Sequence, residues 1–191
     1  MLASEMLTLQ KIRNISAYMQ NRKQFFDGSS YMRSLIALFF LASGAPSMAQ
    51  ELFLQSRNPV SNRLAVFEDD ARVAYLYLTR PGTPQPERDA IAYMRIQPIS
   101  RAEWEAAKKS RGTPMLLKDL ASPAAVIEKP VEREFSFKWS PDGNSVAILR
   151  NGAPLAFASM AEKFGYSKAV SKTSPLANAW DQARYDALFP K

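Results

Sequence analysis

The sequence predicts an α+β fold, an antiparallel sheet of about five or six strands with two packed helices. Two observations lead to this prediction. Residues 134–159 contain an alternating apolar segment, a turn signal and two further β-rich segments, the pattern of a three-stranded meander. Helix-starting signals occur at Ser100 and Ser174, outside the β-rich segments, so helices and strands do not alternate as they do around a parallel sheet.

Two strands are predicted at the start of the sheet, on either side of an acidic turn. Residues 63–67 and 72–78 are rich in apolar, β-branched and aromatic side chains, and Glu68–Ala71 separates them, so we expect an antiparallel hairpin. Residues 79–89 contain three prolines and a glycine, which predicts an exposed loop because proline cannot donate within a central strand. Strand character returns over residues 90–99.

The meander is the clearest local pattern. Phe135, Phe137 and Trp139 alternate with polar residues and therefore share one face of a strand. Ser140–Gly143 is a turn sequence, and Asn151–Gly152 favours a tight hairpin turn between the next two strands.

Two helices are expected from their starting signals. Ser100 and Glu103 have the spacing of a capping box, which predicts a helix over residues 100–110. Ser174–Pro175 fits the first positions of a final helix. Its packing stripe would consist of Leu176, Trp180, Ala183 and Ala187.

Residues 32–49 (MRSLIALFFLASGAPSMA) have the layout of a secretory signal peptide. Arg33 supplies a positive charge, residues 35–42 form a short apolar core, and small residues precede Gln50 at the −3 and −1 positions. The core is shorter than the roughly 18 residues needed to span a bilayer. We therefore expect cleavage before Gln50, a periplasmic or secreted protein, and no stable membrane anchor after cleavage.

Residues 1–31 precede this segment, and two explanations are open. Either translation starts at Met32 and the upstream leader is a mis-called start, or the leader is an extended, positively charged n-region. Residues 50–191 have a suitable length for a single α+β domain. Residues 50–62, which contain Pro59, are expected to lead into its first strand.

Composition narrows the possible functions. The chain has no cysteine and no histidine, which excludes thiol nucleophiles, Ser-His-Asp catalysis and metals held by those residues. Residues 50–191 hold 20 of the 25 basic and 16 of the 18 acidic residues, a net charge of +4. Their basic residues are scattered, so no nucleic-acid partner is predicted. We expect no cofactor and no metal, and the absence of both residue types makes an enzyme the less favoured class.

Polar turns are the first candidates for contacting a protein partner. Glu68, Asp69 and Asp70 form the densest acidic group, while Asp142 and Asn151 mark two hairpin ends that could gather with it into a polar rim. The alternative is that these residues only satisfy backbone donors in their own turns. One short turn rarely supplies the six or more oxygens that calcium requires.

Two tyrosines are a second candidate. Tyr75 and Tyr77 share one face of the predicted second strand, and tyrosine is enriched at protein interfaces. Burial in the core is the alternative for both.

Several motifs together resemble a family of small uncharacterised bacterial proteins. In that family an acidic FEDDG-type turn precedes a tyrosine strand, and a DG…LxNG hairpin follows. The matching segments here are VFEDD (66–70), AYLYL (74–78), FSFKWSPDGNSVAILRNGAPLAFAS (135–159), GYS (165–167) and Trp180. Ala71 stands where the family often has glycine. The resemblance implies a fold and assigns no activity.

Two functions remain as hypotheses. The first is an exported binding protein that acts by protein–protein contact, for example an immunity- or inhibitor-type protein directed at an envelope-targeting toxin or hydrolase. The second is a carboxylate-dependent hydrolase of envelope glycans, using a pair drawn from Glu68, Asp69, Asp70, Asp142 or Asp181.

Overall fold

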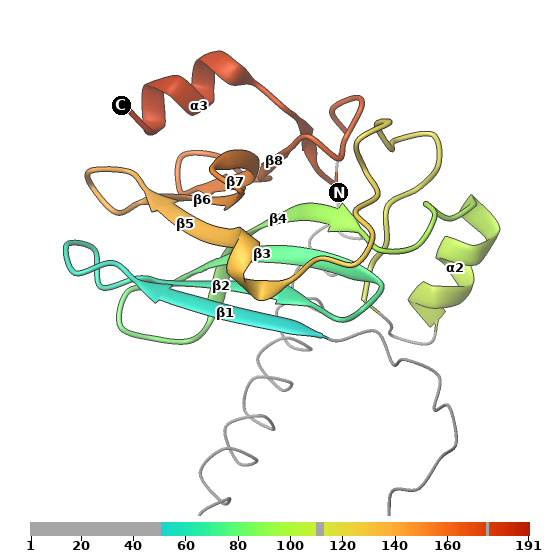
Figure 1. Cartoon of the computed structure of the whole chain (residues 1–191), viewed down its shortest axis with the longest axis horizontal. Helices are drawn as coiled ribbons and strands as arrows, with labels where there is room; N and C mark the ends of the chain where they lie inside the picture. The colour runs from blue at the N-terminus through green and yellow to red at the C-terminus, as the bar shows by residue number, and fades with distance from the viewer. Residues whose placement is uncertain (1–50, 110–112, 175) are drawn as a thin grey trace, which may run out of the picture. The chain divides into compact units, whose positions relative to one another are not determined.

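The strands form two sheets instead of the single sheet expected (Figure 1). The structure, a computed structural model, describes residues 51–109, 113–174 and 176–191. It contains strands and helices in separate segments, so the predicted α+β class is confirmed. The predicted leader and signal peptide, residues 1–31 and 32–49, lie outside the described residues.

The first sheet is an antiparallel meander of four strands in chain order. Its first strand lies within residues 50–62, which we expected to be a lead-in. Its last strand begins inside the segment expected to be a loop, with proline at the first position, where a strand tolerates it. The strands are β1 (Leu52–Arg57), β2 (Leu64–Asp69), β3 (Val73–Thr79) and β4 (Pro86–Met94).

The second sheet contains the predicted meander, extended by two short strands. All of its pairings are antiparallel except the last, between β8 and β9. Asn151 and Gly152 have φ angles of 50° and 79°, the left-handed values that a tight hairpin turn requires. In order, the strands are β5 (Phe135–Trp139), β6 (Ser145–Arg150), β7 (Ala153–Ser159), β8 (Tyr166–Ser167) and β9 (Asn178–Ala179).

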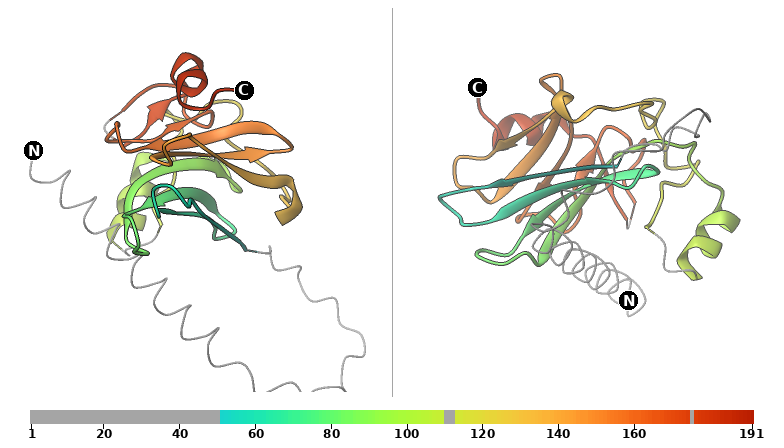
Figure 2. Two further views of the ribbon diagram at one scale, coloured as in Figure 1. Left: turned by 90° about the vertical axis from the view of Figure 1, so that its left-hand side faces the viewer. Right: turned by 60° about the horizontal axis from the view of Figure 1, so that its bottom comes forward.

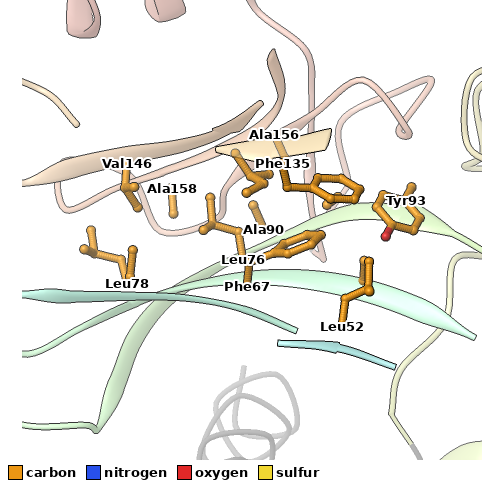
Figure 3. Close-up of a cluster of buried hydrophobic side chains, with 14 of the residues drawn as sticks. Leu52, Phe67, Leu76, Leu78, Ala90, Tyr93, Phe135, Val146, Ala156 and Ala158 are labelled. Carbon is orange, nitrogen blue, oxygen red and sulfur yellow. The ribbon is translucent and has the colours of Figure 1, made fainter. Parts of the chain in front are cut away.

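The two sheets pack face to face around one apolar core (Figures 2 and 3). Phe67 from the first sheet lies 4.9 Å, between ring centroids, from Phe135 of the second. The ring centroids of Tyr93 and Phe135 lie 5.8 Å apart. Phe137 and Trp139 pack against this cluster beside Phe135, so the predicted shared face of β5 is confirmed.

Helix α2 (Arg101–Lys109) begins where the capping box predicts. The Ser100 Oγ and backbone N–H both donate to Glu103 Oε2, at 2.6 and 2.7 Å. Most of its described side chains are exposed, and Trp104 and Ala107 are only half-buried. The helix therefore covers less of the core than expected. A single 3-10 turn, η1 (Glu132–Glu134), precedes β5.

Helix α3 (Gln182–Leu188) covers the outer face of the second sheet (Figure 2). Tyr185 and Phe189 pack on Phe157 of β7, with ring centroids 6.0 and 5.8 Å away. The helix begins at Asp181, whose carboxylate accepts the Arg184 N–H at 3.0 Å, so the predicted start at Ser174 is wrong. Of the predicted stripe, Trp180 packs on Phe157 with ring centroids 5.4 Å apart, whereas Leu176, Ala183 and Ala187 are exposed, so that part of the prediction is wrong.

Candidate partner-binding surface

Three loops meet at one end of the paired sheets (Figure 1, left). They are residues 58–63 between β1 and β2, residues 80–85 between β3 and β4, and residues 140–144 between β5 and β6. The Gly82 N–H donates to the Asn62 carbonyl at 2.8 Å, and Ser61 Oγ donates to the Gly143 carbonyl at 2.8 Å. We call this surface, which joins loops from both sheets, the three-loop end.

The first of these loops is fixed by the side chain of Asn58. Asn58 Oδ1 accepts the N–H groups of Val60 and Ser61 at 2.9 and 3.0 Å, an Asx turn. The Asn58 N–H donates to the Arg63 carbonyl at 2.9 Å and closes the loop. Asn62 adopts a φ of 55°, a left-handed value that asparagine tolerates better than most residues.

The side chain of Arg63 links the loops to one another through hydrogen bonds. Its Nη1 donates at 2.8 Å both to the Thr79 carbonyl, just before the second loop, and to Glu87 Oε2. Its Nε donates at 3.1 Å to Asn144 Oδ1 in the third loop. The side chain is nearly buried, so its charge needs these partners in order to be stable there.

A chain of hydroxyl groups holds the third loop. Ser140 Oγ donates to Asp142 Oδ1 at 2.6 Å and accepts the Ser145 N–H at 2.9 Å. Ser145 Oγ donates to Ser159 Oγ on β7 at 2.9 Å. The hydrogen bonds from Ser140 and from the N–H of Asn144 hold the pKa of Asp142 below its usual value. Asp142 is thus an ionised carboxylate that accepts hydrogen bonds within its own turn.

The outer surface of the three-loop end exposes apolar side chains, two arginines and the carboxylate of Asp142. Val60 is 72% exposed, the largest exposure among the large hydrophobic residues that the structure describes. Arg57 and Arg80 are exposed beside these loops. Four exposed prolines distribute over the three loops: Pro59, Pro81, Pro84 and Pro141.

The structure separates the turn residues that would have formed the polar rim. Asp142 belongs to the three-loop end, whereas Glu68, Asp69 and Asp70 lie at the opposite end of β2. Asn151 lies at the far end of β6 from Ser145. A single polar rim made of all five is therefore wrong, and only Asp142 joins the other loops.

The carboxylates of Asp69 and Asp70 hold the acidic turn by accepting backbone hydrogen bonds. Asp70 Oδ1 accepts the N–H groups of Arg72 and Val73 at 3.0 and 2.9 Å. Asp69 Oδ1 accepts the Ala71 N–H at 2.8 Å. Ala71 has a φ of 65°, the left-handed region that favours glycine, at the position where the resembling family has glycine. Glu68 is half-buried.

Asp69 is buried between the sheets together with a tyrosine. Tyr93 Oη donates to Asp69 Oδ2 at 2.6 Å, and Arg95 Nη1 lies 3.5 Å from the same oxygen. Burial raises the pKa of Asp69, although these partners and the Ala71 N–H act to lower it. Burial and the adjacent carboxylate raise the pKa of Tyr93 well above its usual value.

The candidate tyrosines are buried on β3. Tyr75 and Tyr77 are 6% and 3% exposed, and their rings stack with centroids 5.8 Å apart. Tyr75 Oη donates to the Pro114 carbonyl at 2.8 Å. Burial also raises the pKa of Tyr77. Neither tyrosine contributes to the three-loop end.

Sequence reasoning missed the residues that organise this surface, namely Asn58, Val60, Ser61 and Arg63. The Asn58-Pro59 dipeptide is a recognised turn signal and could have located the first loop. Arg63 gives no local signal, because its partners lie 16, 24 and 81 positions away in the chain.

Comparison of the chain with protein-family models, curated proteins and solved structures found no match. The likeness to the uncharacterised bacterial family stays a prediction.

Neither a metal-binding group nor a membrane-spanning helix is found among the described residues. Among them, no three acidic side chains are grouped so that they could hold a metal ion. None of the helices in the described ranges is both long and apolar enough to cross a membrane.

The carboxylates proposed for a hydrolase lie at three places in the fold, and only Glu68, Asp69 and Asp70 share one of them, the acidic turn. Asp142 and the acidic turn lie at opposite ends of the strands, and Asp181 caps α3. The geometry therefore gives no specific support to a glycan hydrolase, and it directs attention to the three-loop end.

Proposed function

We propose that this protein is an exported binding protein that acts by protein–protein contact, and that the three-loop end is its contact surface. An immunity- or inhibitor-type role against an envelope-targeting toxin or hydrolase is the concrete form of this proposal. One observation carries it: three exposed loops from two sheets are hydrogen-bonded to one another and present an exposed valine among prolines.

Preorganisation is the physical reason that such loops suit recognition. A flexible loop loses conformational freedom on binding, and that loss reduces affinity. Here Asn58 and Arg63 already fix the loop backbone in the free protein. Proline further limits the conformations that the loops can adopt. Pre-formed surfaces of this kind bind partners with little backbone movement.

The domain boundary supports the export part of the proposal. The predicted cut precedes Gln50, and residues 51–191 form a compact unit of their own. Strand β1 begins at Leu52, so cleavage before Gln50 leaves every strand of both sheets in the mature chain.

Affinity capture from envelope extracts tests the contact surface. The exported protein carries a C-terminal tag, and its intact mass shows whether cleavage occurred before Gln50. We expect a specific protein to be retained by the wild type and lost with Val60→Asp, which places a charge in the apolar centre. Leu176→Asp is the matched control, because Leu176 is also exposed and lies outside the three loops. Equal retention by all three proteins, or no specific protein at all, contradicts the proposal.

A further inference from the structure

We infer that the partner presents an apolar socket for Val60 whose border carries carboxylates that pair with Arg57 and Arg80. This inference rests on the proposed function and specifies the chemistry of the partner at the same surface. It follows from three properties of the three-loop end: the apolar side chain that it exposes, the cations beside its loops, and the number of those cations.

The exposed side chain of Val60 suits an apolar socket. Val60 is 72% exposed, and the two hydrogen bonds to Asn58 hold its turn in place. A single exposed apolar side chain is ordinary on a protein surface. Here the three connected loops also expose Pro59, Pro81, Pro84 and Pro141. Valine has a restricted side-chain torsion, so its burial in a socket loses little entropy.

Two exposed arginines lie beside the three loops. Arg57 Nη1 donates at 2.8 Å to Asn62 Oδ1, which orients the guanidinium beside the first loop. Arg80 is 57% exposed at its side chain, and its Nε lies 3.9 Å from Glu87. Glu87 already pairs with the nearly buried Arg63 at 2.8 Å. Arginine forms two-pronged hydrogen bonds with carboxylates and is enriched among the residues that dominate interfaces.

The exposed carboxylate of the third loop, Asp142, keeps its charge but makes its hydrogen bonds within its own turn. Asp142 Oδ1 accepts hydrogen bonds from Ser140 Oγ and the Asn144 N–H, and its Oδ2 accepts one from Asn144 Nδ2 at 3.1 Å. Both oxygens are thus used within the turn. A partner that approaches Val60 therefore meets two arginines whose best complement is carboxylate.

The number of cations favours a protein over nucleic acid. Binding to a phosphate backbone usually engages about six to ten basic groups. The three-loop end offers Arg57 and Arg80 as exposed cations, combined with an apolar centre. An apolar centre bordered by a few arginines is the composition of a protein interface.

Photo-crosslinking in the producing cell tests this inference with the full chain. Val60 is replaced by p-benzoylphenylalanine, and adducts are identified by mass spectrometry. We expect a protein adduct whose yield falls at least about tenfold when Arg57→Glu and Arg80→Glu are introduced together. In purified complexes, raising the salt from about 0.05 to about 0.5 M should weaken binding as well.

Two controls separate charge from folding. Arg101→Glu with Arg133→Glu changes the net charge equally at exposed positions outside the three loops, and should leave the adduct yield unchanged. Urea unfolding of each variant shows that the domain remains folded. The same crosslinker at Leu176, exposed elsewhere, should not give this adduct.

The outcomes distinguish the inference from the function on which it rests. No protein adduct at position 60 contradicts the proposed function itself. An adduct that is equally abundant with both arginines reversed, or that is insensitive to salt, overturns the acidic border while the proposed function stands. An adduct to nucleic acid or lipid overturns both.

Discussion

The Tyr93 hydroxyl donates a 2.6 Å hydrogen bond to Asp69 Oδ2 in the space between the two sheets. Both side chains are buried, at 0% and 1% exposure. A hydrogen bond to a charged buried group contributes more to stability than one at the surface, because water cannot replace the lost donor. This contact therefore stabilises the end of the fold opposite the three loops.

Tyr93→Phe should destabilise the protein by about 2 kcal/mol, because it removes a hydrogen bond to a buried carboxylate and leaves the ring in place. Urea unfolding at neutral pH measures this change. Phe67→Tyr is not a suitable comparison, since it would add a polar group to the core. Tyr185→Phe is better, because Tyr185 lies on α3 and packs on Phe157, so the loss of its hydroxyl leaves Asp69 untouched. A Tyr93→Phe variant as stable as the wild type would contradict this role.

Stability should depend on pH through Asp69. Burial raises the pKa of Asp69 above 3.8, so the folded state binds this proton more tightly than the unfolded chain does. The contribution of Asp69 to stability is then fully present below about pH 3.8 and is lost as the pH rises through the folded pKa.

Comparison with Asp69→Asn isolates this effect. We expect the free energy of unfolding of the wild type to fall relative to that of Asp69→Asn as the pH rises from about 4 to about 7. In Tyr93→Phe the decline should move to higher pH, because the Tyr93 hydrogen bond lowers the pKa of Asp69. A difference between the wild type and Asp69→Asn that stays constant over this range would show that Asp69 does not titrate there.

Local sequence signals predicted the parts of the fold that local contacts determine. The alternation over Phe135–Trp139 and the turn at Asn151–Gly152 both use neighbours in the chain, and the meander they predict is present. The Ser100–Glu103 capping box likewise predicted the start of α2. Strand β1 was missed because its stability depends on pairing with β2, and Pro59 just after it suggested irregular structure.

The candidate site was harder to predict because it depends on how the two sheets pack. Asp142 and the acidic turn are both polar turns, and the sequence does not state at which end of the molecule each lies. The contacts Ser61–Gly143 and Arg63–Asn144 join positions 82 and 81 residues apart. For helix α3, the local signal at Ser174 disagrees with the packing. Asp181 provides the cap instead, because the helix then places Tyr185 and Phe189 on Phe157.

Arg63→Ala should cost about 3 kcal/mol, because it removes a nearly buried ion pair and leaves Glu87 without its closest cation. It should also loosen the loops, since the Thr79 carbonyl and Asn144 lose a shared donor. Hydrogen exchange of the backbone amides in residues 58–63, 80–85 and 140–144 should become faster. Arg80→Ala is the control and should cost less than about 1 kcal/mol, since Arg80 is exposed. Equal effects of the two substitutions would contradict the role of Arg63.

Gly165, just before β8, permits a close approach between the second sheet and β4. Its N–H donates to the Asp89 carbonyl at 3.0 Å. A Cβ atom there would lie 2.4 Å from Ala90 Cβ and 2.5 Å from the Asp89 carbonyl oxygen. Gly165→Ala should therefore destabilise the protein by about 1–3 kcal/mol through overpacking.

Two further substitutions, Gly152→Ala and Ala90→Gly, identify the cause as crowding at Gly165. At Gly152 a Cβ meets no atom within 4 Å, so Gly152→Ala carries only the cost of its φ of 79°, about 1–2 kcal/mol. Adding Ala90→Gly to Gly165→Ala removes the 2.4 Å contact and should restore part of the lost stability, whereas adding it to Gly152→Ala should restore none. Thermal or urea unfolding of the four variants measures the coupling between positions 90 and 165. If Ala90→Gly has the same effect in both backgrounds, the two residues do not compete for space, and the approach of β4 to the second sheet does not depend on glycine at position 165.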